Sequence, residues 1–125
     1  MTLVTIPESG YLGGMKDGLS PVEEKGLNAF KERVLKEFGG RVGLCKIFGS
    51  RARSEGWAES DIDVLVLIEG LTWREKARII DLSSDVNLEC DLMISPLVMK
   101  PEEFSQLLKR ERRLALDIER EGVPL

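Results

Sequence analysis

Two aspartates separated by one residue are the first feature of this sequence that could do chemistry. Asp61 and Asp63 stand at the start of the apolar segment Ile62–Ile68. In an extended chain, residues i and i+2 project from the same face, so both carboxylates are expected to lie close together. Like charges this near must be solvated, protonated or paired with a cation. Magnesium fits, because it bridges one or two carboxylates to substrate phosphates. The alternative is a solvent-exposed strand start without a ligand.

A turn of small residues lies shortly before this pair. Gly49 and Ser50 follow the apolar segment 43–48 and precede Arg51 and Arg53. Backbone N–H groups in such a turn can bind a phosphate, and guanidinium groups can engage its oxygens. An ordinary turn with solvated arginines is the alternative for each residue taken singly. The combination indicates a phosphate-binding turn beside a metal-binding carboxylate pair.

Composition narrows the chemistry further. The 125-residue chain has no histidine, which excludes imidazole bases, histidine-activated nucleophiles and histidine-ligated metals. Its 18 basic and 22 acidic side chains give a net charge of −4, which argues against stable nucleic-acid binding. With no membrane-spanning run and no signal pattern, a cytoplasmic protein is expected. Cys45 and Cys90 are too far apart in sequence for a paired redox or zinc motif and are expected to be buried free thiols.

The elements that must position these residues alternate between helix and strand. Ser20 and Glu23 form a capping-box pattern around Pro21, which predicts a helix that ends near Gly39. A second helix is predicted after Thr72, because Trp73, Ala77, Ile80 and Val86 fit one helix. Trp73 is expected in the core or at its rim. One final helix is predicted after Pro101. Strands are predicted at residues 42–48, 62–68 and 88–94.

This order predicts an α/β (α+β) fold: a small mixed β-sheet with helices packed mainly on one face. Residues 20–125 are expected to form a single domain. Residues 1–19, which contain four glycines, are expected to form a loose N-terminal arm or a short edge strand near Leu3 to Ile6. In the segment 88–94, Glu89 and Asp91 would share one face of the third strand.

The run Gly49-Ser50-Arg51-Ala52-Arg53, followed by Ser60-Asp61-Ile62-Asp63, resembles the signature of the polymerase-β-like nucleotidyltransferase superfamily, and within it the minimal nucleotidyltransferase branch. The resemblance extends over roughly residues 44–94. It implies the nucleotidyltransferase fold, with ATP as the default donor and two Mg²⁺ ions, or Mn²⁺ in their place, as cofactors.

The resemblance also assigns roles to individual residues. Gly49 and Ser50, with Arg51 and Arg53, would bind the nucleoside triphosphate. Asp61 and Asp63 would be catalytic metal ligands, and the third carboxylate of the family corresponds to Asp91, with Glu89 as the rival on the same strand face.

The acceptor follows from the same resemblance. Minimal members commonly pair with a helical HEPN-type toxin and transfer AMP to it, so this chain is expected to be an antitoxin that modifies a hydroxyl of such a partner. A binding-only antitoxin (a pseudoenzyme) and an enzyme that modifies a small molecule such as an aminoglycoside are the alternatives. The sequence leaves the nucleotide preference and the oligomeric state open, a homo-oligomer included.

Overall fold

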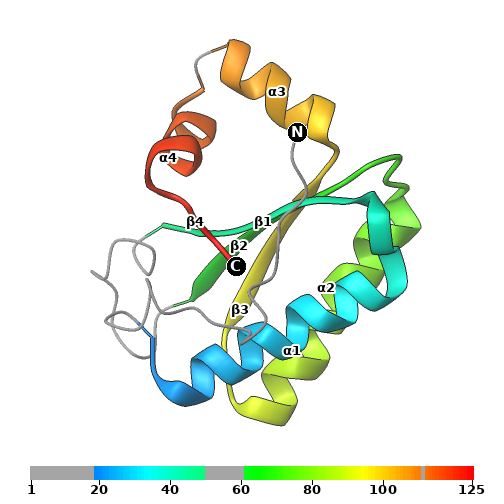
Figure 1. The fold of residues 1–125 in the computed structure, drawn as a ribbon, viewed down its shortest axis with the longest axis vertical. Coiled ribbons are helices and arrows are strands. Elements are labelled where there is room, and N and C mark those ends of the chain that lie inside the picture. Colours follow the sequence, from blue (N-terminus) through cyan, green and yellow to red (C-terminus); the bar gives the residue numbers. More distant parts are fainter. Residues whose placement is uncertain (1–18, 50–60, 111) are drawn as a thin grey trace.

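The computed structural model describes residues 19–49, 61–110 and 112–125, which form one mixed sheet between two layers of helices (Figure 1). The strands run in the order β3-β2-β1-β4. Strand β1 is antiparallel to β2 and to β4, whereas β2 and β3 are parallel. The elements are α1 (Pro21–Phe38), a 3-10 turn (Gly39–Arg41), β1 (Val42–Phe48), β2 (Ile62–Ile68), α2 (Trp73–Cys90), β3 (Ile94–Met99), α3 (Pro101–Lys109), α4 (Arg113–Glu121) and β4 (Val123–Pro124). The predicted α+β class with a small mixed sheet is confirmed.

Both long helices begin with capping boxes, the first of which the sequence predicts. The hydroxyl of Ser20 accepts a hydrogen bond from the backbone N–H of Glu23, whose carboxylate accepts one from the N–H of Ser20. Thr72 and Glu75 make the same reciprocal pair at the start of α2. Each capping box satisfies two backbone donors that the first helical turn leaves free. These local bonds fix where the two helices start.

The sheet separates two apolar layers. On one face, α1 and α2 pack on side chains such as Ile47, Val64 and Val66. On the other face, α3 and α4 pack on Leu65 and Leu67. The expectation that helices lie mainly on one face is therefore wrong: successive residues of β2 point to opposite faces, and apolar residues on both faces need a cover.

The prediction of a third strand at residues 88–94 is also wrong. Helix α2 ends at Cys90, and its C-cap is Asp91, whose φ of 56° is in the left-handed region. Strand β3 begins at Ile94. Alternation of apolar and polar residues over so few positions fits a helix end as well as a strand. Strand β3 contains Pro96, which an edge strand tolerates because only one side of it is paired.

The single final helix predicted after Pro101 is in fact two helices. Helix α3 ends at Lys109 and α4 begins at Arg113. The break turns the chain so that Phe104 from α3 and Ile118 from α4 enter the same apolar layer over β2. One straight helix of that length could not place both side chains on a single small patch of the sheet. No helix in the described ranges is both long enough and apolar enough to cross a membrane.

Phe104 is expected to be the main anchor of the α3–α4 layer. Its side chain is buried against Leu65 and Leu67. Phe104→Ala should lower the free energy of unfolding by about 3–5 kcal/mol, because a cavity adds to the lost burial. Urea denaturation measures this effect, with Leu114→Ala as the control because Leu114 is 47% exposed. Equal losses in the two variants would contradict this packing.

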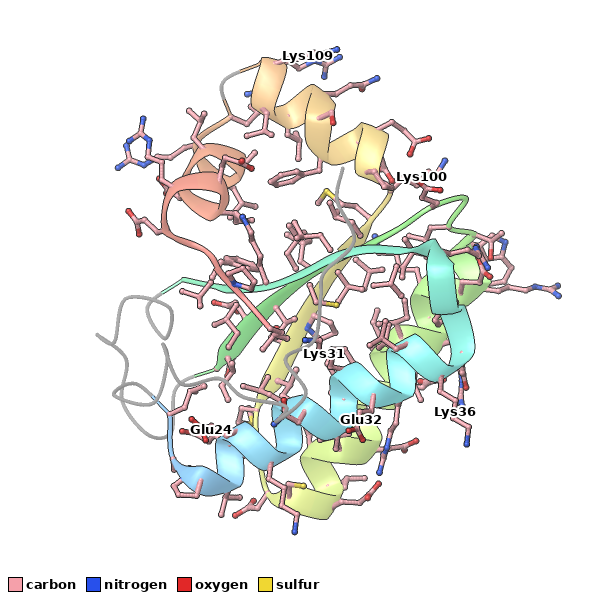
Figure 2. All side chains as sticks on the ribbon, viewed as in Figure 1. Glu24, Lys31, Glu32, Lys36, Lys100 and Lys109 are labelled. Atoms are coloured by element: carbon pink, nitrogen blue, oxygen red, sulfur yellow. The ribbon has the colours of Figure 1, made fainter. Side chains whose placement is uncertain are left out.

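Helix α1 contains a buried lysine, Lys31, which lies near the buried Cys45. The side chain of Lys31 points from α1 toward the sheet, unlike those of Glu32 and Lys36 (Figure 2), and donates to the backbone carbonyl of Leu125. Burial lowers the pKa of Lys31. Burial raises the pKa of the nearby Cys45 thiol to about 12, against the opposing effect of Lys31. Both cysteines are free, as predicted, but only Cys45 is fully buried.

This difference predicts selective modification of the two thiols. Iodoacetamide at about pH 8 should modify the partly exposed Cys90 and leave Cys45 unmodified, because a thiol that is both buried and protonated does not react. Peptide mass spectrometry measures the site of the adduct. Denatured protein should react at both cysteines, and equal modification rates in the native protein would refute the burial of Cys45.

Candidate active site

The carboxylate pair lies where the end of β1 meets the start of β2. The two strands are antiparallel, and their register places Phe48 directly opposite Asp63. Gly49, which follows Phe48, therefore lies beside Asp63. Because side chains alternate along β2, Asp63 shares the face of Leu65 and Leu67, which is the face covered by α3 and α4.

Gly49 touches the carboxylate group itself. A Cβ atom built on Gly49 would lie 2.7 Å from Oδ2 of Asp63 and 3.6 Å from its Cγ. Gly49 also has a φ of +77°, in the left-handed region that disfavours side chains. The backbone conformation therefore favours glycine here, and any Cβ would push against the carboxylate of Asp63. The turn after β1 passes against Asp63 in a way that no other residue type permits without displacing one of them.

The surroundings of Asp63 disfavour its ionised form. Its carboxyl is half-buried, and burial, followed by the neighbouring charge of Asp61, raises its pKa. Within the described residues, neither aspartate has a salt-bridge partner. Desolvation and like-charge repulsion both disfavour two ionised carboxylates unless a cation neutralises them. A divalent ion with oxygen ligands is the group that this donor set fits.

The structure does not bring the third candidate carboxylate to this pair. Asp91 is exposed at the C-cap of α2, and no group of three acidic or cysteine side chains in the described part of the chain is close enough to hold one metal ion. The rival Glu89 lies on α2, where Arg33 forms a salt bridge to it at 2.8 Å. That ion pair makes Glu89 the weaker candidate.

A hydroxyl that sequence reasoning missed lies next to Asp63. In the parallel register of β2 and β3, Ser95 is the partner of Asp63, and its side chain is exposed. Residues paired across two strands project from the same face, so Ser95 adds a polar group beside the carboxylate. No sequence signal could have found it, because Ser95 lies outside the strand that the sequence predicted.

The remaining predicted site residues, Ser50, Arg51 and Arg53, lie outside the described residues. The proposed phosphate-binding role of these three residues stays a prediction. What the described residues establish is a half-buried carboxylate under a glycine turn, with a second carboxylate two positions before it.

Solved structures share this fold. A chain described as "Structure of putative minimal nucleotidyltransferase" aligns with a TM-score of 0.51 and 28% identity, over 81% of this chain and 94% of that one. A chain of the "Crystal structure of the toxin-antitoxin with AMP-PNP" aligns with a TM-score of 0.50 and 20% identity, over 76% of this chain and 68% of that one, a similarity of fold alone. The architecture is that of a nucleotidyltransferase.

Sequence comparison places the chain in a family. The family described as "Polymerase beta, Nucleotidyltransferase" matches residues 32–125. Two proteins of Methanocaldococcus jannaschii are similar. "Putative protein adenylyltransferase MJ0141" is 35% identical over 75 residues, 59% of this chain and 76% of that protein. "Putative protein adenylyltransferase MJ0604" is 30% identical over 84 residues, 67% of this chain and 80% of that protein. The chain belongs to the polymerase β nucleotidyltransferase family and is an enzyme of the nucleotidyltransferase class.

Proposed function

We propose that the chain is a metal-dependent protein adenylyltransferase that transfers AMP from ATP to a hydroxyl group of a partner protein, as the antitoxin of a toxin-antitoxin pair. The observation that carries the chemistry is the contact of the Gly49 turn with the half-buried carboxylate of Asp63, whose pKa burial and Asp61 both raise. A carboxylate placed this way needs a cation, and a turn this close can present a phosphate to that cation.

Each residue then has a defined task. Asp61 and Asp63 would hold the divalent ions, and Gly49, which has no side chain, lets the turn pass directly beside Asp63. Bound Mg²⁺ would clamp the attacking and leaving oxygens of an in-line displacement at the α-phosphate. The third carboxylate is Asp91, which is exposed at the C-cap of α2. It also accepts the proton of the acceptor hydroxyl, a task for which this chain has no histidine.

The acceptor is proposed from the relatives. Two similar proteins carry the name protein adenylyltransferase, and a chain of the same fold comes from a toxin-antitoxin structure with AMP-PNP. A helical HEPN-type toxin is the partner we propose.

Co-expression with a candidate HEPN-type toxin tests this directly. The partner, purified with the wild-type chain and measured by intact-mass spectrometry, should be heavier by one or more AMP groups. A partner from cells that express Asp61→Asn should have its unmodified mass. An unmodified partner that still binds the wild-type chain would instead establish a binding-only antitoxin. Transfer of label from α-labelled ATP to an aminoglycoside, but not to protein, would establish small-molecule modification.

Asp91→Asn is expected to slow transfer at least about tenfold and to raise the Mg²⁺ concentration needed for half-maximal rate, because one ligand loses its charge. Asparagine also tolerates the left-handed conformation that Asp91 adopts, so the backbone should not change. Initial rates over a range of Mg²⁺ concentrations measure both effects.

Glu89→Gln is the matched control for this variant. Glu89 is two residues away and is paired with Arg33, so its loss should leave the Mg²⁺ dependence unchanged. The opposite result, a changed Mg²⁺ dependence for Glu89→Gln alone, would assign the third carboxylate to Glu89.

A further inference from the structure

Helix α2 exposes an apolar stripe on the side away from the core. Trp73 is 76% exposed, Ile80 42% and Leu88 86%, and the small residues Ala77 and Ser84 between them are also exposed. The spacings of four, three, four and four residues place all five on one face of the helix. The sequence led us to expect Trp73 in the core or at its rim, and this expectation is wrong.

The core does not account for this stripe. Helix α2 buries a different face, formed by Ile79, Leu82, Ser83 and Val86, against α1 and the sheet. A helix that is apolar on its buried face and again on its outer face has a second surface to cover.

The charges along α2 are ordered in an unusual way. The first half carries Arg74, Lys76 and Arg78, besides Glu75, which caps the helix and is paired with Arg41, and the second half carries Asp81, Asp85 and Glu89. This order opposes the helix dipole, which favours anions near the N-terminus and cations near the C-terminus. An antiparallel helix with the same order would place each basic half beside an acidic half.

Three of these charged residues remain available along one side of the stripe. Arg78 and Glu89 are used in salt bridges to α1. Arg74, Asp81 and Asp85 form no salt bridge within the described ranges, and the guanidinium of Arg74 lies over the ring of Trp73, 5.3 Å from its centroid.

We infer that α2 pairs antiparallel with α2 of a second copy of this chain. In one two-fold register, Trp73 faces Ser84 of the other copy and Ile80 faces its Ala77, so each of these two large side chains meets a small one. Leu88 then lies beyond the start of the other copy's α2. Along the helix axis, the same register places Arg74 between Asp81 and Asp85 of the second copy. All three residues lie on the same side of the stripe. A single register thus matches both size and charge, and its two-fold symmetry repeats every contact. This self-complementarity is what identifies a second copy as the occupant.

The pairing surface and the candidate active site lie on opposite sides of the sheet. Helix α2 covers the face of Val64 and Val66, whereas Asp63 shares the face covered by α3 and α4. The inference therefore does not depend on the proposed function, and a partner protein could approach Asp63 in the dimer.

Sedimentation velocity tests the inference. The wild-type chain should be a dimer at about 10–100 µM, and Ile80→Glu should raise the dimer Kd at least about tenfold. Val22→Glu is the matched control, because Val22 is 56% exposed on α1 and lies outside the stripe. Ile80 is exposed, so its variant should fold, and circular dichroism would check this independently. A monomeric wild type, or an Ile80→Glu variant with unchanged Kd, would overturn the pairing.

Charge reversal tests the register. Arg74→Asp should weaken self-association, and so should the double variant Asp81→Arg/Asp85→Arg, because each brings like charges together. Mixing the two variants should restore a heterodimer, in which both copies of the contact are complementary. If mixing restores nothing, the antiparallel register is wrong. AMP transfer by Ile80→Glu should equal that of the wild type, so a failure of the dimer is distinguishable from a failure of the enzyme.

Discussion

Asp63→Asn is expected to abolish nucleotidyl transfer while making the protein more stable. The substitution keeps the shape of the side chain and removes the charge that would hold the metal ions. Loss of one preorganised electrostatic group costs roughly 10²–10³-fold in rate, and a metal ligand should cost at least as much. Label transfer from α-labelled ATP measures the loss. Glu32→Gln is the control, because Glu32 is exposed on α1, which covers the other face of the sheet.

The gain in stability has an electrostatic cause and a definite pH dependence. Burial and Asp61 raise the pKa of Asp63 above its ordinary value of 3.8. The folded protein therefore binds this proton more tightly than the unfolded chain does. The wild type accordingly loses stability as pH rises from below 3.8 through the raised pKa, and asparagine does not titrate. The advantage of Asp63→Asn should be small in acid and full at neutral pH.

Thermal melts with and without Mg²⁺ provide a readout independent of activity. Without the ion, Asp63→Asn should have the higher Tm at pH 7. Added Mg²⁺ should raise the Tm of the wild type, because an ion that binds only the folded state stabilises it, and should have little effect on the variant. Equal responses to Mg²⁺ in both proteins would remove Asp63 from the metal site.

Gly49→Ala is expected to cause the second largest effect. The added methyl group would lie 2.7 Å from Oδ2 of Asp63, so the carboxylate or the turn must move. A displacement of about 1 Å in a reacting group can cost roughly 100-fold in rate. The left-handed backbone should lower the free energy of unfolding by about 1–2 kcal/mol in addition. Steady-state kinetics and urea denaturation measure the two effects separately.

Two other glycines separate the possible causes. Gly39 has a φ of +53°, but no atom lies within 4 Å of the position that a Cβ would take, so Gly39→Ala should lose stability and keep its activity. Gly40 has the same open space without the positive φ, so Gly40→Ala should change neither. If Gly49→Ala behaves like Gly39→Ala, the contact with Asp63 has no role in catalysis.

The sequence by itself determined the features that depend on residues close together in the chain. The capping box of Ser20 and Glu23 joins residues three positions apart, and the structure contains it. Helix α2 also begins after Thr72, as predicted. Strands β1 and β2 have the bounds that their apolar runs predict. The shared face of Asp61 and Asp63 follows from the two-residue period of a strand alone. The family signature is local in the same sense.

Only the tertiary structure decided what depends on residues far apart in the chain. A short alternating run fits a helix end or a strand, and contacts with α1 and the sheet made Leu88 to Cys90 the last turn of α2. The apolar residues on both faces of β2 did not reveal which helix would cover each face. Strand register, which no local pattern encodes, brought Gly49 against Asp63 and Ser95 beside it. From the sequence, Trp73 and Ile80 are expected on the buried face of a helix. Only the structure shows that both side chains are exposed.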